Sequence, residues 1–345
     1  MRTNIGIGLG NTSIIVLNEK RRKAIRETSV MAVDKQTHYI LKIGNDAKNM
    51  LRRLPGNITR VHPSWRELMA KYDVTLKFVK YYMDLTYKKK LFKPNLIIAV
   101  PVYITEDEEQ ALLTAANELG AKNVYLIPES VAAAVGAGVD VYSPSINMIM
   151  DVGGGKTELA VTSTGNIISF RVSKISGKTF DDAIIKYVRG RYNVNILDDA
   201  AEQIKIELGD LSSGADGDGG AVVKSKKVSG TDIVTGLPKT LILTSAELTE
   251  PLRNEAGLLI DELKVYFEKL PEEIIADIKE NGICLVGGGS MLAGFSDYIA
   301  DNTGIAVNKS ENPINCVVTG IGDAFLRIRG MEKTEHNIVA VRNQF

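Results

Sequence analysis

The sequence contains few of the residues that build metal clusters or disulfide frameworks. Among 345 residues there are only two cysteines, Cys284 and Cys316, and three histidines. The histidines, His38, His62 and His336, lie far apart and show none of the spacings of a zinc site. Two cysteines cannot make a disulfide framework, and Cys284 lies inside an apolar strand pattern. We therefore expect both to be reduced packing thiols in a cytosolic protein.

The sequence also lacks an excess of charge and any long apolar run. It has 42 basic and 42 acidic residues, so its formal net charge is zero, which argues against a surface built for nucleic acid. No run of about 18 apolar residues occurs, so no spanning helix is expected. Residues 1–6 enter a strand pattern at once, so we expect no signal peptide.

What the chain does contain is a globular composition, 44% hydrophobic and 24% charged, at a length that suits two domains. Residues 96–101 form an apolar run typical of a strand buried on both faces. Thr105 and Glu108 predict a capping box at the start of a helix, and Gly120 predicts its end. In the second half, helices are predicted near 179–192, 198–208 and 245–270, and residues 211–220 resemble a linker rich in glycine and aspartate. Alternating strands and helices predict an α/β fold.

Two segments, 5–17 and 146–161, each combine an apolar strand, a glycine-containing turn and a second apolar strand. The second turn, Gly153-Gly154-Gly155, leaves backbone N–H groups open to phosphate oxygens, and Asp151 ends the preceding strand, where a metal counter-charge would be needed. A third glycine turn, at 287–290, follows a predicted strand and is predicted to lead into a helix, whose N-terminus would favour anions. Each turn alone is also consistent with tight packing only.

The ordered set of three turns is more specific, and it resembles the actin, sugar kinase and heat-shock ATPase superfamily. Within that superfamily the chain is similar to the MreB family of bacterial actins over essentially its whole length. The segments that carry this similarity are 54–58, 125–127, 132–138, 147–155, 182–189, 201–209, 235–239, 271–274, 286–289 and 303–305.

This resemblance implies an actin-like fold of two related ribonuclease-H-like domains, each with a smaller inserted subdomain. The implied boundaries are 1–31, 71–143 and 316–345 for subdomain IA, 32–70 for IB, 144–178 and 250–315 for IIA, and 179–249 for IIB. It also implies a cytoplasmic protein that binds ATP and Mg²⁺ and polymerises into paired antiparallel protofilaments. Such filaments lie at the anionic inner face of the cell membrane, with other cytoskeletal or morphogenetic proteins, and support cell shape or related motility.

The resemblance further assigns roles to individual residues. Glu129 would position the attacking water, and Asp151 would hold Mg²⁺ through water. The first phosphate turn maps to Gly10, Asn11, Thr12 and Ser13, and the second to Gly153, Gly154 and Gly155. The nucleoside contacts map to Glu202, Lys205, Gly288, Gly289 and Ser290.

The chain departs from the family pattern around the phosphates. Gly8 stands where the family has an aspartate, and Lys156 stands where it has a threonine that orients the attacking water. Glu129 is preceded by Pro128 and followed by Ser130, whereas the family has a glutamate before this position and a proline after it. An ammonium at 156 could bind phosphate or pair with Glu129, which predicts a weak ATPase with slow hydrolysis. The alternative is that Lys156 points to solvent, as most lysines do.

A second local feature is the segment 87–94, where Leu91 and Phe92 stand among four lysines. Such a loop can insert apolar side chains into a bilayer while its lysines meet anionic headgroups, and the resemblance places a membrane loop here. The alternative is an ordinary charged turn in which Leu91 and Phe92 pack inward.

Two rival functions share the implied fold. A small-molecule kinase would need an acceptor-binding aspartate motif, and none is evident in the sequence. A chaperone-type ATPase would need a substrate-binding domain, for which we expect the chain to be too short.

Overall fold

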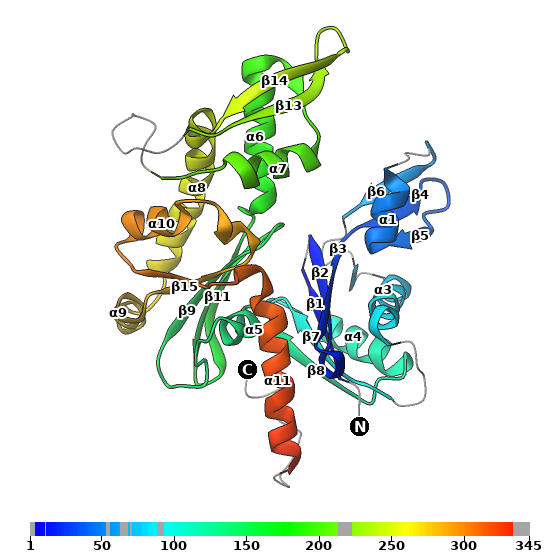
Figure 1. The fold of residues 1–345 in the computed structure, drawn as a ribbon. Helices are drawn as coiled ribbons and strands as arrows, with labels where there is room; N and C mark the ends of the chain where they lie inside the picture. The colour runs from blue at the N-terminus through cyan, green and yellow to red at the C-terminus, as the bar shows by residue number, and fades with distance from the viewer. Residues whose placement is uncertain are drawn as a thin grey trace. The chain divides into compact units, whose positions relative to one another are not determined.

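The computed structural model describes residues 4–10, 12–52, 56–62, 68–69, 71–87, 93–212 and 223–333. The chain divides into two compact units (Figure 1). Unit 1 comprises Met1–Ser145, Ala160–Phe170 and Ile314–Phe345, and unit 2 comprises Ile146–Leu159 and Arg171–Pro313. The division into four subdomains stays a prediction.

Unit 1 is organised around a sheet of order β3-β2-β1-β7-β8. Its strands are β1 (Asn4–Leu9), β2 (Ser13–Asn18), β3 (Lys23–Thr28), β7 (Asn95–Val100) and β8 (Asn123–Pro128). The first three strands pair antiparallel, whereas β7 pairs parallel with both β1 and β8. All six residues of β7 are buried, as predicted for this apolar run.

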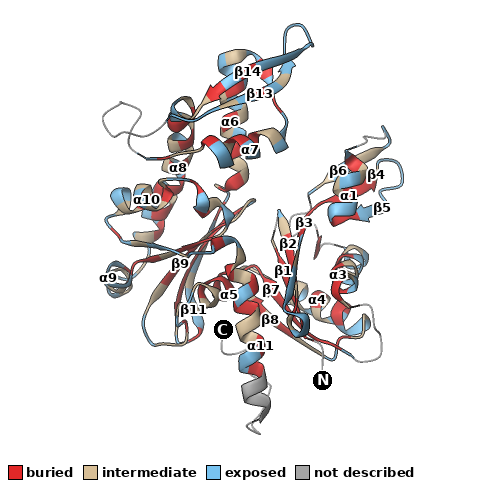
Figure 2. Ribbon diagram, viewed as in Figure 1, coloured by how far each residue is buried: buried red, intermediate tan, exposed pale blue. Residues whose placement is uncertain are grey.

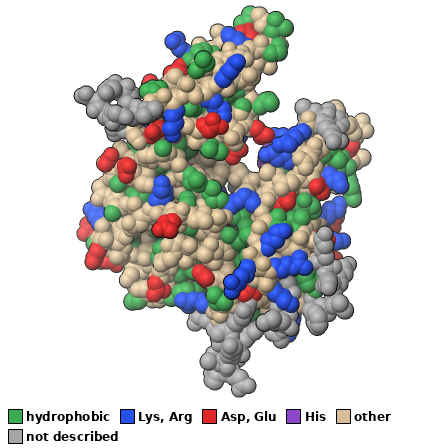
Figure 3. Space-filling view, viewed as in Figure 1, with side chains coloured by type: hydrophobic (Ala, Val, Ile, Leu, Met, Phe, Trp, Pro, Cys, Tyr) green, Lys and Arg blue, Asp and Glu red, His purple; other side chains and the backbone are tan. Residues whose placement is uncertain are grey.

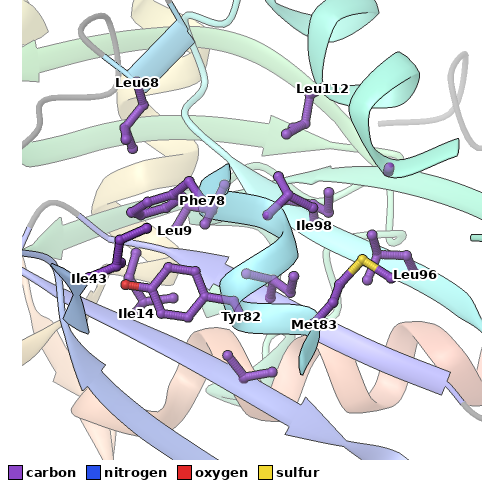
Figure 4. Packing of buried hydrophobic residues seen from close by; sticks show 14 of the residues in the cluster. Leu9, Ile14, Ile43, Leu68, Phe78, Tyr82, Met83, Leu96, Ile98 and Leu112 are labelled. Atoms are coloured by element: carbon purple, nitrogen blue, oxygen red, sulfur yellow. The ribbon is translucent and has the colours of Figure 1, made fainter. Parts of the chain in front are cut away.

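The helices of unit 1 include α3 (Tyr72–Thr86), α4 (Glu106–Glu118), α5 (Glu129–Gly136) and α11 (Cys316–Lys333). Aromatic residues of α3, including Phe78 and Tyr82, pack against apolar residues of β1, β2 and β7 to form the core (Figure 4). The capping box of Thr105 and Glu108 starts α4 as predicted, and Gly120 follows that helix with a φ of +87°.

Helices α5 and α11 cross so closely that only glycine fits at two positions. A Cβ on Gly136 would lie 1.9 Å from the carbonyl oxygen of Cys316, and one on Gly320 would lie 1.8 Å from that of Ala132. This contact holds the start of α11 against the helix that begins with Glu129.

Unit 1 also contains a small sheet of order β5-β4-β6, formed by β4 (Met31–Asp34), β5 (Ile40–Ile43) and β6 (Ile58–Val61). Helix α1 (Gly44–Leu51) packs on it through a separate core. The carboxylate of Glu27 accepts a hydrogen bond of 2.6 Å from the N–H of Asn45 and so satisfies the start of α1.

The second large sheet has the order β11-β10-β9-β15-β16. Its strands are β9 (Asn147–Val152), β10 (Thr157–Ser163), β11 (Asn166–Ser173), β15 (Ile283–Val286) and β16 (Val307–Lys309). As in unit 1, three consecutive strands are extended by two later ones, and β15 pairs parallel with both β9 and β16. The repeated order agrees with the prediction of two related halves.

Unit 2 adds the helices α6 (Gly177–Tyr192), α7 (Asp198–Leu208), α8 (Ser245–Phe267), α9 (Glu272–Asn281) and α10 (Phe295–Thr303). A small sheet contains β12 (Val194–Asn195), β13 (Ser225–Asp232) and β14 (Pro238–Thr244). Buried residues line the inner faces of these helices, while the outer face of α7 is exposed (Figure 2). The three helices predicted from the sequence in this region are therefore confirmed.

The prediction that the third glycine turn leads into an α-helix at once is wrong. Gly288–Met291 forms a short 3₁₀ helix, and α10 begins only at Phe295. Gly287 and Gly294 have φ angles of +85° and +71°, which an α-helix cannot include, and consecutive glycines are poor helix formers. Among the described helices, none has the length and apolar composition needed to cross a bilayer.

Candidate functional site

The first glycine turn, between β1 and β2, lies in unit 1 beside the carboxylate of Glu129. A Cβ on Gly10 would lie 2.6 Å from the carbonyl oxygen of Ser13 and 3.7 Å from Oε1 of Glu129. Glu129 is the first residue of α5. The structure therefore brings Gly10, Ser13 and Glu129 together, with exposed Thr12 between the first two. Asn11 lies outside the described residues.

Sequence reasoning missed a cation at this turn. Arg26 of β3 donates from Nη1 to Oγ of Ser13 at 2.9 Å. Its Nη2 donates to the carbonyl oxygen of Ile314 at 2.9 Å and to Oδ1 of Asn315 at 3.1 Å. Partial burial lowers the pKa of Arg26, but an arginine stays charged in proteins. Arg26 thus fixes the hydroxyl of Ser13 in place.

The second glycine turn, Gly153–Gly155, is built within unit 2 and supports the start of α6. The carbonyl oxygen of Gly153 accepts from the N–H of Gly177 at 3.0 Å, and that of Gly154 accepts from the N–H of Lys178 at 2.8 Å. The N–H of Gly153 donates to the carbonyl oxygen of Lys156 at 2.9 Å. That N–H is therefore used inside the hairpin, contrary to the expectation that the whole turn is bare.

Lys156 is buried, with 8% of its surface exposed. Its ammonium forms an ion pair with the carboxylate of Glu158, which is 1% exposed. Residues two apart in an extended chain lie on the same face, which explains the pairing. The alternative that Lys156 points to solvent is wrong, and its charge is compensated by a carboxylate of its own hairpin.

Lys205 of α7 joins the second turn through the start of α6. Its Nζ donates to the carbonyl oxygen of Gly177 at 2.7 Å and lies 2.9 Å from Oδ1 of Asp181. A Cβ on Gly177 would lie 3.3 Å from Cα of Gly154. Burial raises the pKa of Asp181, Lys205 opposes this shift, and exposed Glu202 adds to it. Lys205 is therefore linked to the second turn through Gly177, and Glu202 lies close enough to Asp181 to affect its pKa. Their assignment to a nucleotide site stays a prediction.

The third glycine turn closes on the strand that carries Asp151. A Cβ on Gly287 would lie 2.3 Å from Oδ1 of Asp151, and one on Gly289 would lie 2.4 Å from Cγ1 of Val152. The buried Ser290 donates from Oγ to the carbonyl oxygen of Gly287 at 2.7 Å. Thus Gly288, Gly289 and Ser290 belong to a turn packed on the end of β9.

The described residues provide a limited set of metal ligands. No group of three or more His, Cys, Asp or Glu side chains within them is placed to hold a metal ion. Mg²⁺ usually takes one or two carboxylates, with phosphate oxygens and water completing its shell. Asp151 at the end of β9 fits that role when a phosphate supplies the other oxygens.

Comparison with known proteins identifies the family of the chain. Residues 2–333 match the model of the family described as MreB/Mbl protein. The chain is 36% identical over 320 residues to the cell shape-determining protein Mbl of Bacillus cereus, covering 92% of this chain and 94% of that one. It is 34% identical over 329 residues to the cell shape-determining protein MreB of Escherichia coli, covering 93% and 92%.

Two solved structures are similar in fold. MreB5 of Spiroplasma citri bound to AMPPNP gives a TM-score of 0.87 at 29% identity, covering 97% of this chain and 99% of that one. The MamK double helical filament gives a TM-score of 0.71 at 16% identity, covering 94% and 99%. At that identity the second likeness concerns the fold alone.

Proposed function

The chain belongs to the MreB/Mbl family and has its actin-like fold, and from this premise we propose that it binds ATP with Mg²⁺ and polymerises into membrane-associated filaments. The family relatives are cell shape-determining proteins. We further propose that these filaments support cell shape or related motility.

The observation that carries nucleotide binding is the pair of glycine turns, each with polar groups fixed around it. In unit 1 Glu129 lies beside Gly10 and Arg26 donates to Ser13, and in unit 2 Lys205 donates to Gly177, whose N–H donates to Gly153 of the turn. MreB5 has been crystallised with AMPPNP and with ADP, which supports the same ligand class here. Asp151 would hold the Mg²⁺ ion through water, and the ion would supply positive charge that offsets the charge of the phosphates.

We assign the phosphates to the two turns and the nucleoside to unit 2. Gly10, Asn11, Thr12 and Ser13 bind phosphate from one turn, and Gly153, Gly154 and Gly155 from the other. Glu202, Lys205, Gly288, Gly289 and Ser290 bind the nucleoside. Support comes from the hydrogen bond of Lys205 to Gly177, which in turn bonds to Gly153, and from the close approach of Gly287 to Asp151.

We expect hydrolysis to be slow. The position whose threonine orients the attacking water in the family is Lys156 here, and its ammonium is paired with Glu158. Glu129 retains the role of the water-positioning carboxylate. At position 156 a threonine hydroxyl is replaced by an ammonium paired with Glu158, so no hydroxyl is offered there. Because position 8 is a glycine, the first hairpin lacks the carboxylate found in the family. A Cβ on Gly8 would lie 3.2 Å from Cγ1 of Val317, which leaves little room for a side chain there.

Assembly and location complete the proposal. The filaments are homopolymers of paired antiparallel protofilaments. Each subunit has four subdomains with the boundaries given above. They lie in the cytoplasm against the anionic inner face of the membrane, together with other morphogenetic proteins. The membrane loop, Leu91 and Phe92, lies outside the described residues, so its support is the sequence pattern alone.

Sedimentation of the purified chain without nucleotide, with ATP and with AMPPNP tests this function. We expect polymer in the pellet only with nucleotide. Ser13→Asp places a negative charge at the first phosphate turn and should abolish pelleting. The matched control Ser225→Asp, at an exposed position of β13, should pellet normally. A soluble monomer that transfers phosphate to a small molecule, or a nucleotide-driven chaperone cycle without polymer, would overturn the proposal in favour of its rivals.

A further inference from the structure

One edge of the unit 1 sheet, the edge formed by strand ends and not by an outermost strand, is held together by a chain of asparagine side chains. Strands β1, β7 and β8 are parallel and begin at this edge, with Asn4, Asn95 and Asn123 in register. Nδ2 of Asn123 donates to Asn95, and Nδ2 of Asn95 donates to Asn4, each at 3.1 Å. Nδ2 of Asn4 donates to Glu19 at 3.3 Å. The first residues of these three strands are thereby linked side by side, at the end of β1 opposite the one that leads to Gly10.

The same edge carries a concentration of positive charge. We use the term basic edge for the exposed residues Lys20, Arg21, Arg22, Lys23, Lys93 and Lys122. The N–H of Lys122 donates to the carbonyl oxygen of Pro94 at 2.7 Å, which keeps Lys93 and Lys122 side by side. Within the segments 19–23, 93–95 and 122–123, Glu19 is the single carboxylate. None of the six cations forms an ion pair with another described residue.

The turn between β2 and β3 is held by hydrogen bonds of Asn18 and contains an arginine in an unfavourable backbone conformation. It contains a 3₁₀ helix, Glu19–Arg21, whose first turn is capped by Asn18. Nδ2 of Asn18 also donates to the carbonyl oxygen of Thr86 at 3.1 Å, at the end of α3. Arg22 adopts the left-handed region with a φ of 49°, where glycine or asparagine is favoured. The backbone conformation at this position favours glycine, yet the residue is an arginine, which adds a positive charge to the edge.

We propose that the basic edge is an electrostatic contact surface for an anionic phospholipid bilayer. This inference rests on the proposed membrane association and adds a surface to it. The chain as a whole is neutral, so the attraction is local to this edge, where Lys and Arg side chains gather in the lower part of unit 1 (Figure 3).

A bilayer fits these residues better than a nucleic acid does. Each Lys or Arg near an anionic membrane strengthens binding about fivefold without a shaped pocket. Single-stranded nucleic acids also need aromatic side chains for stacking. Tyr87, the aromatic residue beside the described edge, packs against the core instead.

Vesicle co-sedimentation of the full chain tests the proposal. The vesicles are made of phosphatidylcholine alone or with part of it replaced by phosphatidylglycerol. The edge variant changes four cations to glutamine, and a control variant makes the same change at four exposed lysines of unit 2. The four edge changes are Lys20→Gln, Arg21→Gln, Arg22→Gln and Lys23→Gln, and the four control changes are Lys224→Gln, Lys227→Gln, Lys264→Gln and Lys279→Gln.

We expect binding that requires phosphatidylglycerol, is about tenfold or more weaker in the edge variant, and is unchanged in the control variant. Arg22→Gly should weaken binding about fivefold while leaving the melting temperature the same or higher, which a purely structural role would not produce. Equal binding of the edge and control variants would overturn the proposal that the basic edge contacts the bilayer. In that case, if the double variant Leu91→Ser with Phe92→Ser abolished binding, the proposed membrane association would still stand. Wild-type protein that binds duplex DNA but no vesicle would overturn both.

Discussion

The two glycine hairpins share the order of strand, turn and strand, but they place positive charge differently. In unit 1 the cation comes from outside the hairpin, since Arg26 of β3 donates to the hydroxyl of Ser13. In unit 2 the cation is Lys156 of the hairpin itself, buried in an ion pair with Glu158.

This difference separates binding from hydrolysis. A hydroxyl that accepts from a guanidinium must direct its own proton elsewhere, so Ser13 is prepared to donate to a phosphate oxygen. Lys156 has its charge compensated within the protein and replaces a hydroxyl. Under the proposed function, the first hairpin would therefore bind the ligand, and the second would limit the hydrolysis that follows.

The largest expected effect is on the ion pair of the second hairpin. Glu158→Ala leaves the ammonium of Lys156 without its carboxylate in the interior, which should lower the free energy of unfolding by about 3–5 kcal/mol. Asp182→Ala, which removes one of the two exposed carboxylates paired with Lys178, should cost no more than about 1 kcal/mol. Urea unfolding measures both, and similar losses in the two variants would show that Glu158 does not compensate Lys156.

A smaller loss is expected at the third glycine turn, which packs on the strand of the second hairpin. Gly287→Ala places a Cβ 2.3 Å from Oδ1 of Asp151 in a residue whose φ is +85°. Gly236→Ala meets nothing within 4 Å at a φ of +72°, so it should lose only the roughly 1–2 kcal/mol of the left-handed backbone. Gly287→Ala should lose a further ~1–3 kcal/mol from overpacking. Equal melting temperatures for the two variants would contradict this contact.

The smallest expected effect concerns the first hairpin. Arg26→Ala removes a charged hydrogen bond to Ser13, and we expect ATP affinity to fall about tenfold, as for the loss of one such bond. Lys23→Ala, on the same strand and with the same change in net charge, should bind ATP normally. Displacement of a fluorescent ATP analogue measures both, and equal affinities would remove Arg26 from the site.

Local patterns in the sequence predicted the elements that depend on neighbouring residues. The capping box at Thr105, the buried strand β7 and helix α7 follow from short-range signals, and all three are present. The contact of Arg26 with Ile314 joins residues 288 positions apart, so no periodicity could indicate it. The burial of Lys156 depends on the environment of one strand face, which a general preference of lysine for the surface does not describe.

Phosphate release and sedimentation, measured together on the wild type and Lys156→Thr in the presence of ATP and Mg²⁺, test the central claim most directly. We expect both proteins to form polymer, and we expect phosphate release per polymerised subunit to be slow in the wild type and several times faster in Lys156→Thr. Equal release from the two polymers would contradict the proposal that Lys156 limits hydrolysis, and absence of polymer with ATP would contradict the filament function itself.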